Sequence, residues 1–284
     1  MERAGGELVR AELAFKLEAA AERLRSLESV LVAYSGGVDS TLVMEIGHRV
    51  LGPACTAVIA RSPSLPAAEL EGALSLARGR GIEVRVLDTD EVELEGYRRN
   101  QPDRCYFCKS ELYGRLTELA ASVGVGAVVD GFNTDDRADW RPGRKAAVEL
   151  GVVSPLDEAG LSKAEVRTAA RELGLPNWDK EEAACLSSRV PYGTLIDPAM
   201  LGRIEEAEAI VRAEGFRQVR VRHGAGTAVV EVDPEQVGRL GDAATLARVS
   251  GRLGELGYSR VEVAPGGYRK GNLNLQAPAT ADGA

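Results

Sequence analysis

The first part of the chain alternates between two patterns of apolar and polar positions. Short apolar runs typical of buried strands cover residues 30–34, 54–60, 82–87 and 126–130. Segments with an apolar residue every three or four positions, which predict helices, cover residues 8–27, 38–50, 67–78 and 109–123. Strands that alternate with helices predict an α/β fold, a doubly wound parallel sheet whose ligands bind beyond the carboxyl ends of the strands.

A different pattern begins after residue 198. It predicts a helix over residues 200–214, strands over 218–222 and 227–232 around a glycine-rich hairpin, one or two helices over 234–256, and a strand over 260–263. We therefore expect a large domain over residues 1–198, a second, smaller α+β domain over residues 199–275, and a disordered tail over residues 276–284.

The residues just before this change combine a local helix signal with an irregular stretch. Ser162 and Glu165 have the spacing of a capping box, which predicts a helix over residues 162–173. Residues 176–198 show little periodicity, so we expect neither a helix nor a strand there.

Composition narrows the possible classes of partner. The 284-residue chain has a formal net charge of −8, whereas proteins that bind nucleic acid present a basic face, so we expect no nucleic-acid partner. No apolar run is long enough to cross a membrane, and the N-terminal segment lacks the apolar stretch of a secretory signal. We expect a cytoplasmic protein without a membrane partner, whose four cysteines are ligands or reactive groups rather than disulfides.

The first predicted strand runs into a tight turn, Ser-Gly-Gly-Val-Asp-Ser over residues 35–40. Adjacent glycines let backbone N–H groups approach a ligand, and the positive end of the following helix attracts phosphate. The lysine and spacing of a Walker A loop are absent. The alternative is a turn that only caps the helix. The nucleotide-binding candidates here are Ser35, Gly36, Gly37, Asp39 and Ser40.

A second polar loop follows the strand predicted over residues 126–130. It contains Gly131, Asn133, Asp135 and Asp136, whose oxygen atoms suit Mg²⁺ and the polar edges of a nucleotide. Taken alone, this pattern is also common in solvated turns. Taken with the Ser-Gly-Gly turn it is a stronger candidate, because it resembles the Gly-x-Asn-x-Asp-Asp element that recurs in ATP-pyrophosphatase folds.

Three of the cysteines are candidates for chemistry. Cys105 and Cys108 form a Cys-x-x-Cys pair, which fits zinc, redox or iron–sulfur chemistry, and it lies just before the helix predicted to start at residue 109. Cys55 begins a predicted buried strand and is expected to act as a small apolar residue. Cys185 lies in the irregular stretch, where reactive groups are common, so we expect it to be functional.

Several motifs together resemble one family. Residues 175–180 read Leu-Pro-Asn-Trp-Asp-Lys, residues 184–193 read Ala-Cys-Leu-Ser-Ser-Arg-Val-Pro-Tyr-Gly, and residues 267–274 read Gly-Tyr-Arg-Lys-Gly-Asn-Leu-Asn. With the Ser-Gly-Gly turn and residues 139–144, they resemble the LarE family of ATP-dependent sulfur transferases, over roughly residues 26–275. These enzymes have an ATP-pyrophosphatase (PP-loop) domain, here expected over residues 1–198.

The resemblance implies a reaction and its residues. ATP and Mg²⁺ activate the carboxylates of a nicotinic-acid-derived mononucleotide as adenylates, and sulfur then replaces oxygen to give the thiocarboxylates of a nickel-pincer cofactor used by lactate racemase. The expected catalytic residues are Asp39 and Cys185. Arginine binds phosphate and carboxylate through two hydrogen bonds, so the candidates for the anionic substrate are Arg189, Arg220, Arg222 and Arg269.

The family contains two sources of sulfur. In one version, a cysteine at the position of Cys185 gives up its own sulfur and becomes dehydroalanine. In the other, three cysteines, here Cys105, Cys108 and Cys185, hold a 4Fe-4S cluster that carries an extra sulfide. We favour the cluster version, because a sacrificial enzyme does not need the Cys-x-x-Cys pair. The resemblance also implies a sulfide donor or persulfide carrier and a homo-oligomer, for which a hexamer is one form.

Other enzymes with the same ATP loop are the rival interpretations. A tRNA thiolase would need a basic face, and an ammonia-dependent synthetase of the NAD or GMP type would not need the cysteine motifs. A nucleotide-binding module without activity would bind ATP and never release pyrophosphate.

Overall fold

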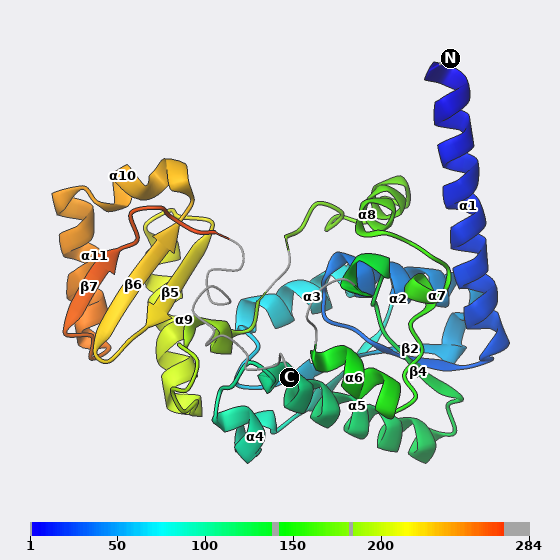
Figure 1. Ribbon diagram of the computed structural model, residues 1–284, viewed down its shortest axis with the longest axis horizontal. Helices are drawn as coiled ribbons and strands as arrows, with labels where there is room; N and C mark the ends of the chain where they lie inside the picture. Colours follow the sequence, from blue (N-terminus) through cyan, green and yellow to red (C-terminus); the bar gives the residue numbers. More distant parts are fainter. Residues whose placement is uncertain (1, 138–141, 182–183, 270–284) are drawn as a thin grey trace, which may run out of the picture. The chain divides into compact units, whose positions relative to one another are not determined.

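The structure is a computed structural model that describes residues 2–137, 142–181 and 184–269 (Figure 1). The predicted tail over residues 276–284, residues 139–141 of one family motif and residues 270–274 of another lie outside the described residues. The chain divides into two compact units, one formed by Met1–Glu91 with Cys105–Ala183, and the other by Val92–Arg104 with Ala184–Ala284. In the described part, no helix is both long enough and apolar enough to cross a lipid bilayer.

The first unit contains a parallel four-stranded sheet, as the alternating pattern predicted. Its strands lie in the order β3-β2-β1-β4, with the bounds β1 Val30–Ala33, β2 Cys55–Arg61, β3 Val84–Asp88 and β4 Ala127–Val129. The helices of this unit are α1 Glu2–Ser26, α2 Val38–Leu51, α3 Ala67–Gly79, α5 Arg104–Val123, α6 Pro142–Glu149, α7 Pro155–Glu158 and α8 Lys163–Glu172. The predicted α/β fold is confirmed.

Strand β1 shows why both faces of this sheet carry helices. All four of its residues are buried, and successive side chains point to opposite faces. Val30 and Val32 join a core with residues of α1, α2 and α8, whereas Leu31 and Ala33 join a second core with residues of α5 and α6. Figure 1 shows α2 and α5 on opposite sides of this sheet. A strand buried on both faces reads as a continuous apolar run, which is the signal seen in the sequence.

The order of the strands creates a crevice at one edge of the sheet. The chain passes from β1 to β2 on one side, while β4 pairs with β1 on the other side, with Val32 opposite Val129. The loops that follow β1 and β4 therefore start from adjacent strands at the same edge of the sheet. In open α/β sheets, this reversal point is where ligands bind.

The second unit is built around a three-stranded sheet in the order β5-β6-β7. Strand β5 (Val219–His223) pairs antiparallel with β6 (Thr227–Val232), which pairs in parallel with β7 (Arg260–Val263). Its helices are α4 Glu95–Arg98, α9 Pro198–Ala213, α10 Val237–Leu240 and α11 Ala243–Glu255. Phe216, Val221, Val230 and Leu253 lie in its core. The predicted α+β arrangement of this region agrees with these elements.

The second unit begins earlier than the predicted boundary near residue 198, and it includes a segment from the first half of the chain. The Asn100 side chain donates to the carbonyls of Val190 (3.3 Å) and Pro191 (2.8 Å). The N–H groups of Gly193 and Ile196 donate to the carbonyls of Asn100 and Arg98. These long-range hydrogen bonds join residues 92–104 to the stretch after Ala184, and no local sequence pattern encodes them.

Helix α5 begins at Arg104 rather than at residue 109. Cys105 and Cys108 are therefore the second and fifth residues of this helix, and their predicted place in a loop before the helix was wrong. The Arg104 guanidinium contributes to this start, because it donates to the side chain of Asn100 and to the carbonyl of Ser187 (3.1 Å).

Candidate active site

The Ser-Gly-Gly turn leaves the carboxyl end of β1 and enters α2. Gly36 has a φ of +71°, and a Cβ atom at this position would lie 2.6 Å from the Cβ of Ala73 on α3. Both the backbone conformation and the close packing of α3 therefore require glycine at Gly36. The turn is therefore packed closely against α3.

The two serines of the turn contact each other. Ser40 Oγ accepts a hydrogen bond from the Ser35 N–H (3.1 Å) and lies 3.0 Å from Ser35 Oγ. No side chain caps α2 at Gly37. The first N–H groups of a helix have no intrahelical acceptor and carry the positive end of its dipole, so this turn can bind an anion such as a phosphate.

The loop after β4 packs directly on the start of α2. A Cβ atom at Gly131 would lie 2.6 Å from the backbone nitrogen of Ser40. Asn133 Nδ2 donates to Asp39 Oδ1 (3.1 Å), and the Asn133 N–H donates to the buried carboxylate of Asp136 (3.0 Å). The two polar loops singled out in the sequence therefore meet at Asp39.

Lys163, which the sequence analysis did not single out, binds the other oxygen of Asp39. Its Nζ atom lies 2.5 Å from Asp39 Oδ2, and its backbone N–H donates to Asp135 Oδ2 (3.2 Å). Lys163 is the first residue of α8, and the predicted capping box between Ser162 and Glu165 is present. The capping box fixes the start of α8 and so directs this lysine toward the crevice.

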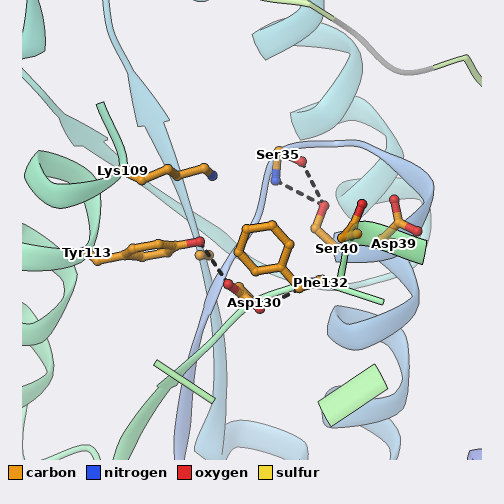
Figure 2. Close-up of a pocket in the computed structure, with 10 residues that line it drawn as sticks. Ser35, Asp39, Ser40, Lys109, Tyr113, Asp130 and Phe132 are labelled. Atoms are coloured by element: carbon orange, nitrogen blue, oxygen red, sulfur yellow. Dashed lines mark hydrogen bonds between the residues drawn. The ribbon is translucent and has the colours of Figure 1, made fainter. Parts of the chain in front are cut away.

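A cavity of about 160 Å³ opens beside these loops (Figure 2). Its lining residues are Ala33, Ser35, Asp39, Ser40, Lys109, Tyr113, Asp130, Gly131, Phe132 and Asp136. Figure 2 shows Lys109 and Tyr113 extending from α5 toward the loop after β1. Lys109 Nζ lies 5.3 Å from the centre of the Tyr113 ring and adds a cation to the cavity.

Asp130, at the end of β4, anchors one wall of this cavity. Its buried carboxylate accepts hydrogen bonds from Tyr113 Oη (2.8 Å) and Ser154 Oγ (2.7 Å). Burial raises the pKa of Asp130, although these hydrogen bonds and the nearby Lys109 charge oppose the rise. Burial and the Asp130 charge raise the pKa of Tyr113 well above its usual value, so Tyr113 stays a hydrogen-bond donor at neutral pH.

The cysteine pair lies on the helix that lines this cavity. Cys105, Lys109 and Tyr113 follow each other at four-residue spacing and so lie along one face of α5. Cys105 is exposed and Cys108 is half-buried. Among the described residues, no three His, Cys, Asp or Glu side chains are grouped so as to hold a metal ion, and none of the four cysteines forms a disulfide.

Cys185 belongs to the second unit, where it precedes a short 3-10 helix, Leu186–Arg189. The Cys185 side chain is half-buried. Arg222 Nη1 donates to the Ser188 carbonyl (2.7 Å) and Arg222 Nη2 to Glu231 (2.9 Å). Arg189 is buried with Glu208, and each of its guanidinium nitrogens donates to an acceptor in the protein.

The other two predicted arginines lie in the same unit. The Arg220 guanidinium lies 5.3 Å from the centre of the Tyr268 ring, and burial together with the Arg189 charge lowers its pKa. Arg269 is exposed. Arg220 and Arg222 alternate with buried valines on β5, so both point to one face of the small sheet.

Comparison with known proteins places the chain in a family. No model of a protein family matches it. It is 44% identical over 262 residues to an uncharacterised Synechocystis protein, covering 91% of this chain and 98% of that protein. It is 40% identical over 266 residues to the pyridinium-3,5-bisthiocarboxylic acid mononucleotide synthase of Lactiplantibacillus plantarum, covering 93% of this chain and 95% of that enzyme. The chain belongs to the LarE family.

A more distant similarity agrees with the fold of the LarE family. The chain is 28% identical over 166 residues to an NH(3)-dependent NAD(+) synthetase of Methanococcoides burtonii, covering 55% of this chain. The family resemblance read from the sequence motifs is confirmed, and so is the PP-loop α/β fold of the first unit.

Proposed function

We propose that the chain is an ATP-dependent sulfur transferase. It adenylylates the carboxylates of pyridinium-3,5-biscarboxylic acid mononucleotide and converts them to thiocarboxylates for a nickel-pincer cofactor such as that of lactate racemase. One observation carries the proposal: two strand-end loops meet at Asp39 beside a cavity with an uncapped helix end, in a chain similar over most of its length to a pyridinium-3,5-bisthiocarboxylic acid mononucleotide synthase.

The first unit performs the ATP step. Ser35, Gly36, Gly37 and Ser40 hold the pyrophosphate of ATP against the N-terminus of α2. Asp39, with Asn133, Asp135 and Asp136 nearby, supplies oxygen atoms for the Mg²⁺ of the nucleotide. Lys163 and Lys109 add positive charge where the leaving pyrophosphate develops negative charge.

The acceptor is a small anionic mononucleotide. Its carboxylate oxygen attacks the α-phosphorus of ATP, pyrophosphate leaves, and the carboxylate becomes an acyl adenylate. Attack of sulfur on the carbonyl carbon then expels AMP. Arg220, Arg222 and Arg269 are the proposed groups for the phosphate and carboxylates of the acceptor, because guanidinium groups suit both anions. Arg189 was expected to act with them, but its N–H groups already bind protein acceptors.

For the sulfur source we retain the three-cysteine version. Three thiolates from Cys105, Cys108 and Cys185 suit a 4Fe-4S cluster with one iron left open, and such a cluster would supply a bound sulfide. One observation supports the pair: Cys105 and Cys108 lie on the helix that lines the ATP cavity. The alternative is that Cys185 gives up its own sulfur.

One experiment tests the proposal. Anaerobically purified protein is incubated with Mg-ATP, sulfide and the biscarboxylate mononucleotide, and the products are identified by mass spectrometry. We expect AMP, pyrophosphate and an acceptor in which sulfur has replaced oxygen. Asp39→Ala should abolish pyrophosphate release while the protein stays folded. The control is Lys145→Met, which changes an exposed side chain. ADP and inorganic phosphate as products would overturn the assignment.

Measurements on the same purified protein distinguish the two sulfur sources from each other and the proposed function from the rival enzyme classes. The cluster version predicts about four irons per chain, lost on replacement of Cys105, Cys108 or Cys185. Two results together would favour the sacrificial version. Activity would be lost only in Cys185→Ala, and turnover of the wild-type protein would leave Cys185 lighter by the mass of one hydrogen sulfide. Tight tRNA binding with a steep salt dependence would favour a tRNA thiolase.

A further inference from the structure

The backbone around Cys185 is held mainly by arginine side chains. Arg189 Nη1 donates to the carbonyls of Ala184 (2.6 Å) and Cys185 (2.8 Å). Arg104 donates to the carbonyl of Ser187, and Arg222 to that of Ser188. Cys185 lies outside any sheet or long helix, at the start of the short 3-10 helix. In that helix the carbonyls of Cys185 and Ser187 also accept from the N–H groups of Ser188 (3.0 Å) and Val190 (3.2 Å). Guanidinium groups therefore reinforce a segment that has little regular secondary structure of its own.

Arg189 is itself fixed from behind by a buried carboxylate. Its Nε and Nη2 atoms donate to the two oxygens of Glu208 at 2.7 and 3.2 Å, a bidentate pair. The Arg189 side chain is 2% exposed and the Glu208 side chain 0%. Because Nε and Nη2 are bound to Glu208, only the Nη1 group remains for other partners. This group points at the carbonyls of Ala184 and Cys185.

Glu208 connects this pair to the rest of the second unit. It lies on α9 and also accepts hydrogen bonds from the Val221 N–H of β5 (3.2 Å) and from Arg212 (2.7 Å). Burial acts to raise the pKa of Glu208, but the Arg189 hydrogen bond and the surrounding arginines lower it overall, so this carboxylate is charged at neutral pH. A helix, a strand and the Cys185 segment are thus joined through one buried ion pair.

We infer that the Arg189–Glu208 pair is a positioning device for Cys185. The pair fixes the carbonyl of Cys185, and this fixes the direction in which the half-exposed side chain leaves the backbone. A buried ion pair is no more stabilising than well-packed apolar side chains, so stability alone does not account for it. Arg189 is a positioning residue that acts through Cys185, and its contribution rests on the proposed function of that cysteine.

The ATP step takes place in the first unit and sulfur transfer requires Cys185, so the two should separate in a variant. Arg189→Lys keeps the charge but loses the planar fork. We expect pyrophosphate release to stay within about twofold of wild type, while thiocarboxylate formation falls by about 100-fold, the scale of loss for a reacting group misplaced by an ångström. The rate at which iodoacetamide alkylates Cys185, followed by peptide mass spectrometry on protein without iron, should change in the same variant.

Arg212→Met is the matched control. Arg212 also pairs with Glu208, through a contact to the Glu208 carboxylate that does not involve the Cys185 segment. It should keep both half-reactions and the wild-type alkylation rate of Cys185. The thermal unfolding of a third variant, Arg189→Met, is compared with that of the wild type, so that a loss of folded structure is recognised.

The outcomes distinguish this inference from the proposed function. Wild-type protein that releases pyrophosphate but forms no thiocarboxylate would overturn the function. Thiocarboxylate formation by Arg189→Lys at the wild-type rate, with unchanged Cys185 alkylation, would overturn the positioning role alone. A parallel fall of both half-reactions in Arg189→Lys, or an equal loss in Arg212→Met, would also overturn it, because it would mark a general structural role.

Discussion

Lys163 Nζ lies 2.5 Å from Asp39 Oδ2, although 124 residues separate the two in the chain. Both side chains are about one-fifth exposed, so the charges interact in a partly desolvated setting. The amine stands beside the carboxylate that we assign to nucleotide-bound Mg²⁺. Under the proposed function, arrival of that cation would change the pairing of Lys163 and free its positive charge for the leaving pyrophosphate.

Lys163→Met should therefore slow the ATP step. We expect pyrophosphate release to fall by about 100-fold, the usual scale when a preorganised group that faces transition-state charge is removed. The measurement is pyrophosphate release at saturating Mg-ATP and acceptor. Lys145→Met removes an exposed lysine whose pairing with Glu149 spans 3.8 Å and should leave the rate unchanged. Equal rates in both variants would remove Lys163 from the mechanism.

Gly131→Ala should disturb the contact between the β4 loop and α2. The added Cβ would lie 2.6 Å from the Ser40 nitrogen, which cannot move without shifting the helix start. We expect a loss of about 1–3 kcal/mol of unfolding free energy, together with weaker ATP binding. Gly72 is an exposed residue of α3, and a Cβ atom there would meet no atom within 4 Å. Gly72→Ala should therefore leave the free energy of unfolding unchanged or raise it slightly. Similar unfolding midpoints for the two variants would contradict the close approach.

Cys55 should be the least reactive of the four cysteines. Burial raises the pKa of its thiol to about 12, so almost none is thiolate at neutral pH, and the side chain is 6% exposed. Peptide-resolved alkylation of metal-free protein with iodoacetamide should label exposed Cys105 well before Cys55. Labelling of Cys55 as fast as Cys105 in folded protein would show that the start of β2 opens to solvent.

Glu208 should make the stability of the second unit depend on pH. Its folded pKa is lowered from the ordinary value of 4.5, so the stability that it contributes is present above that value and is lost as the pH falls through the folded pKa. Urea unfolding at pH 7 should find Glu208→Gln about 3 kcal/mol less stable than wild type, because Arg189 loses its buried partner. The difference in unfolding free energy between Glu208→Gln and wild type should become smaller below pH 4.5. A gap of constant size down to pH 3 would argue against a charged Glu208.

The sequence predicted those parts of the first unit that depend on local pattern. The run at residues 30–34 and the following Ser-Gly-Gly turn gave a strand, a turn and a helix, and these elements are present. Asn133 was grouped with the turn because its loop resembles an element that recurs in ATP-pyrophosphatase folds, and it does bind Asp39. Periodicity and turn chemistry act over a few residues, so they are readable without the fold.

The residues that were missed depend on contacts far apart in the chain. Lys163 and Lys109 lie on helices, where lysine normally faces solvent, and nothing in their neighbourhood marks them as lining the crevice. The start of α5 was missed for the same reason, because Arg104 bonds to Ser187, 83 residues away. The capping box at Ser162 was the one local signal that could have drawn attention to Lys163.

The second unit is made from two stretches of chain, and this has a consequence for biosynthesis. Tyr97 and Asn100 bond to residues about 90 positions later, so the segment 92–104 leaves the ribosome long before its partners exist. It must wait while the parallel sheet of the first unit is completed, and such distant pairings close slowly. A fragment that starts at Ala184 would lack that segment and would leave Ser187, which is fully buried in the whole chain, without its tyrosine partner. The C-terminal sheet is therefore not an independently transferable module, and grafting it onto another protein would require residues 92–104 as well.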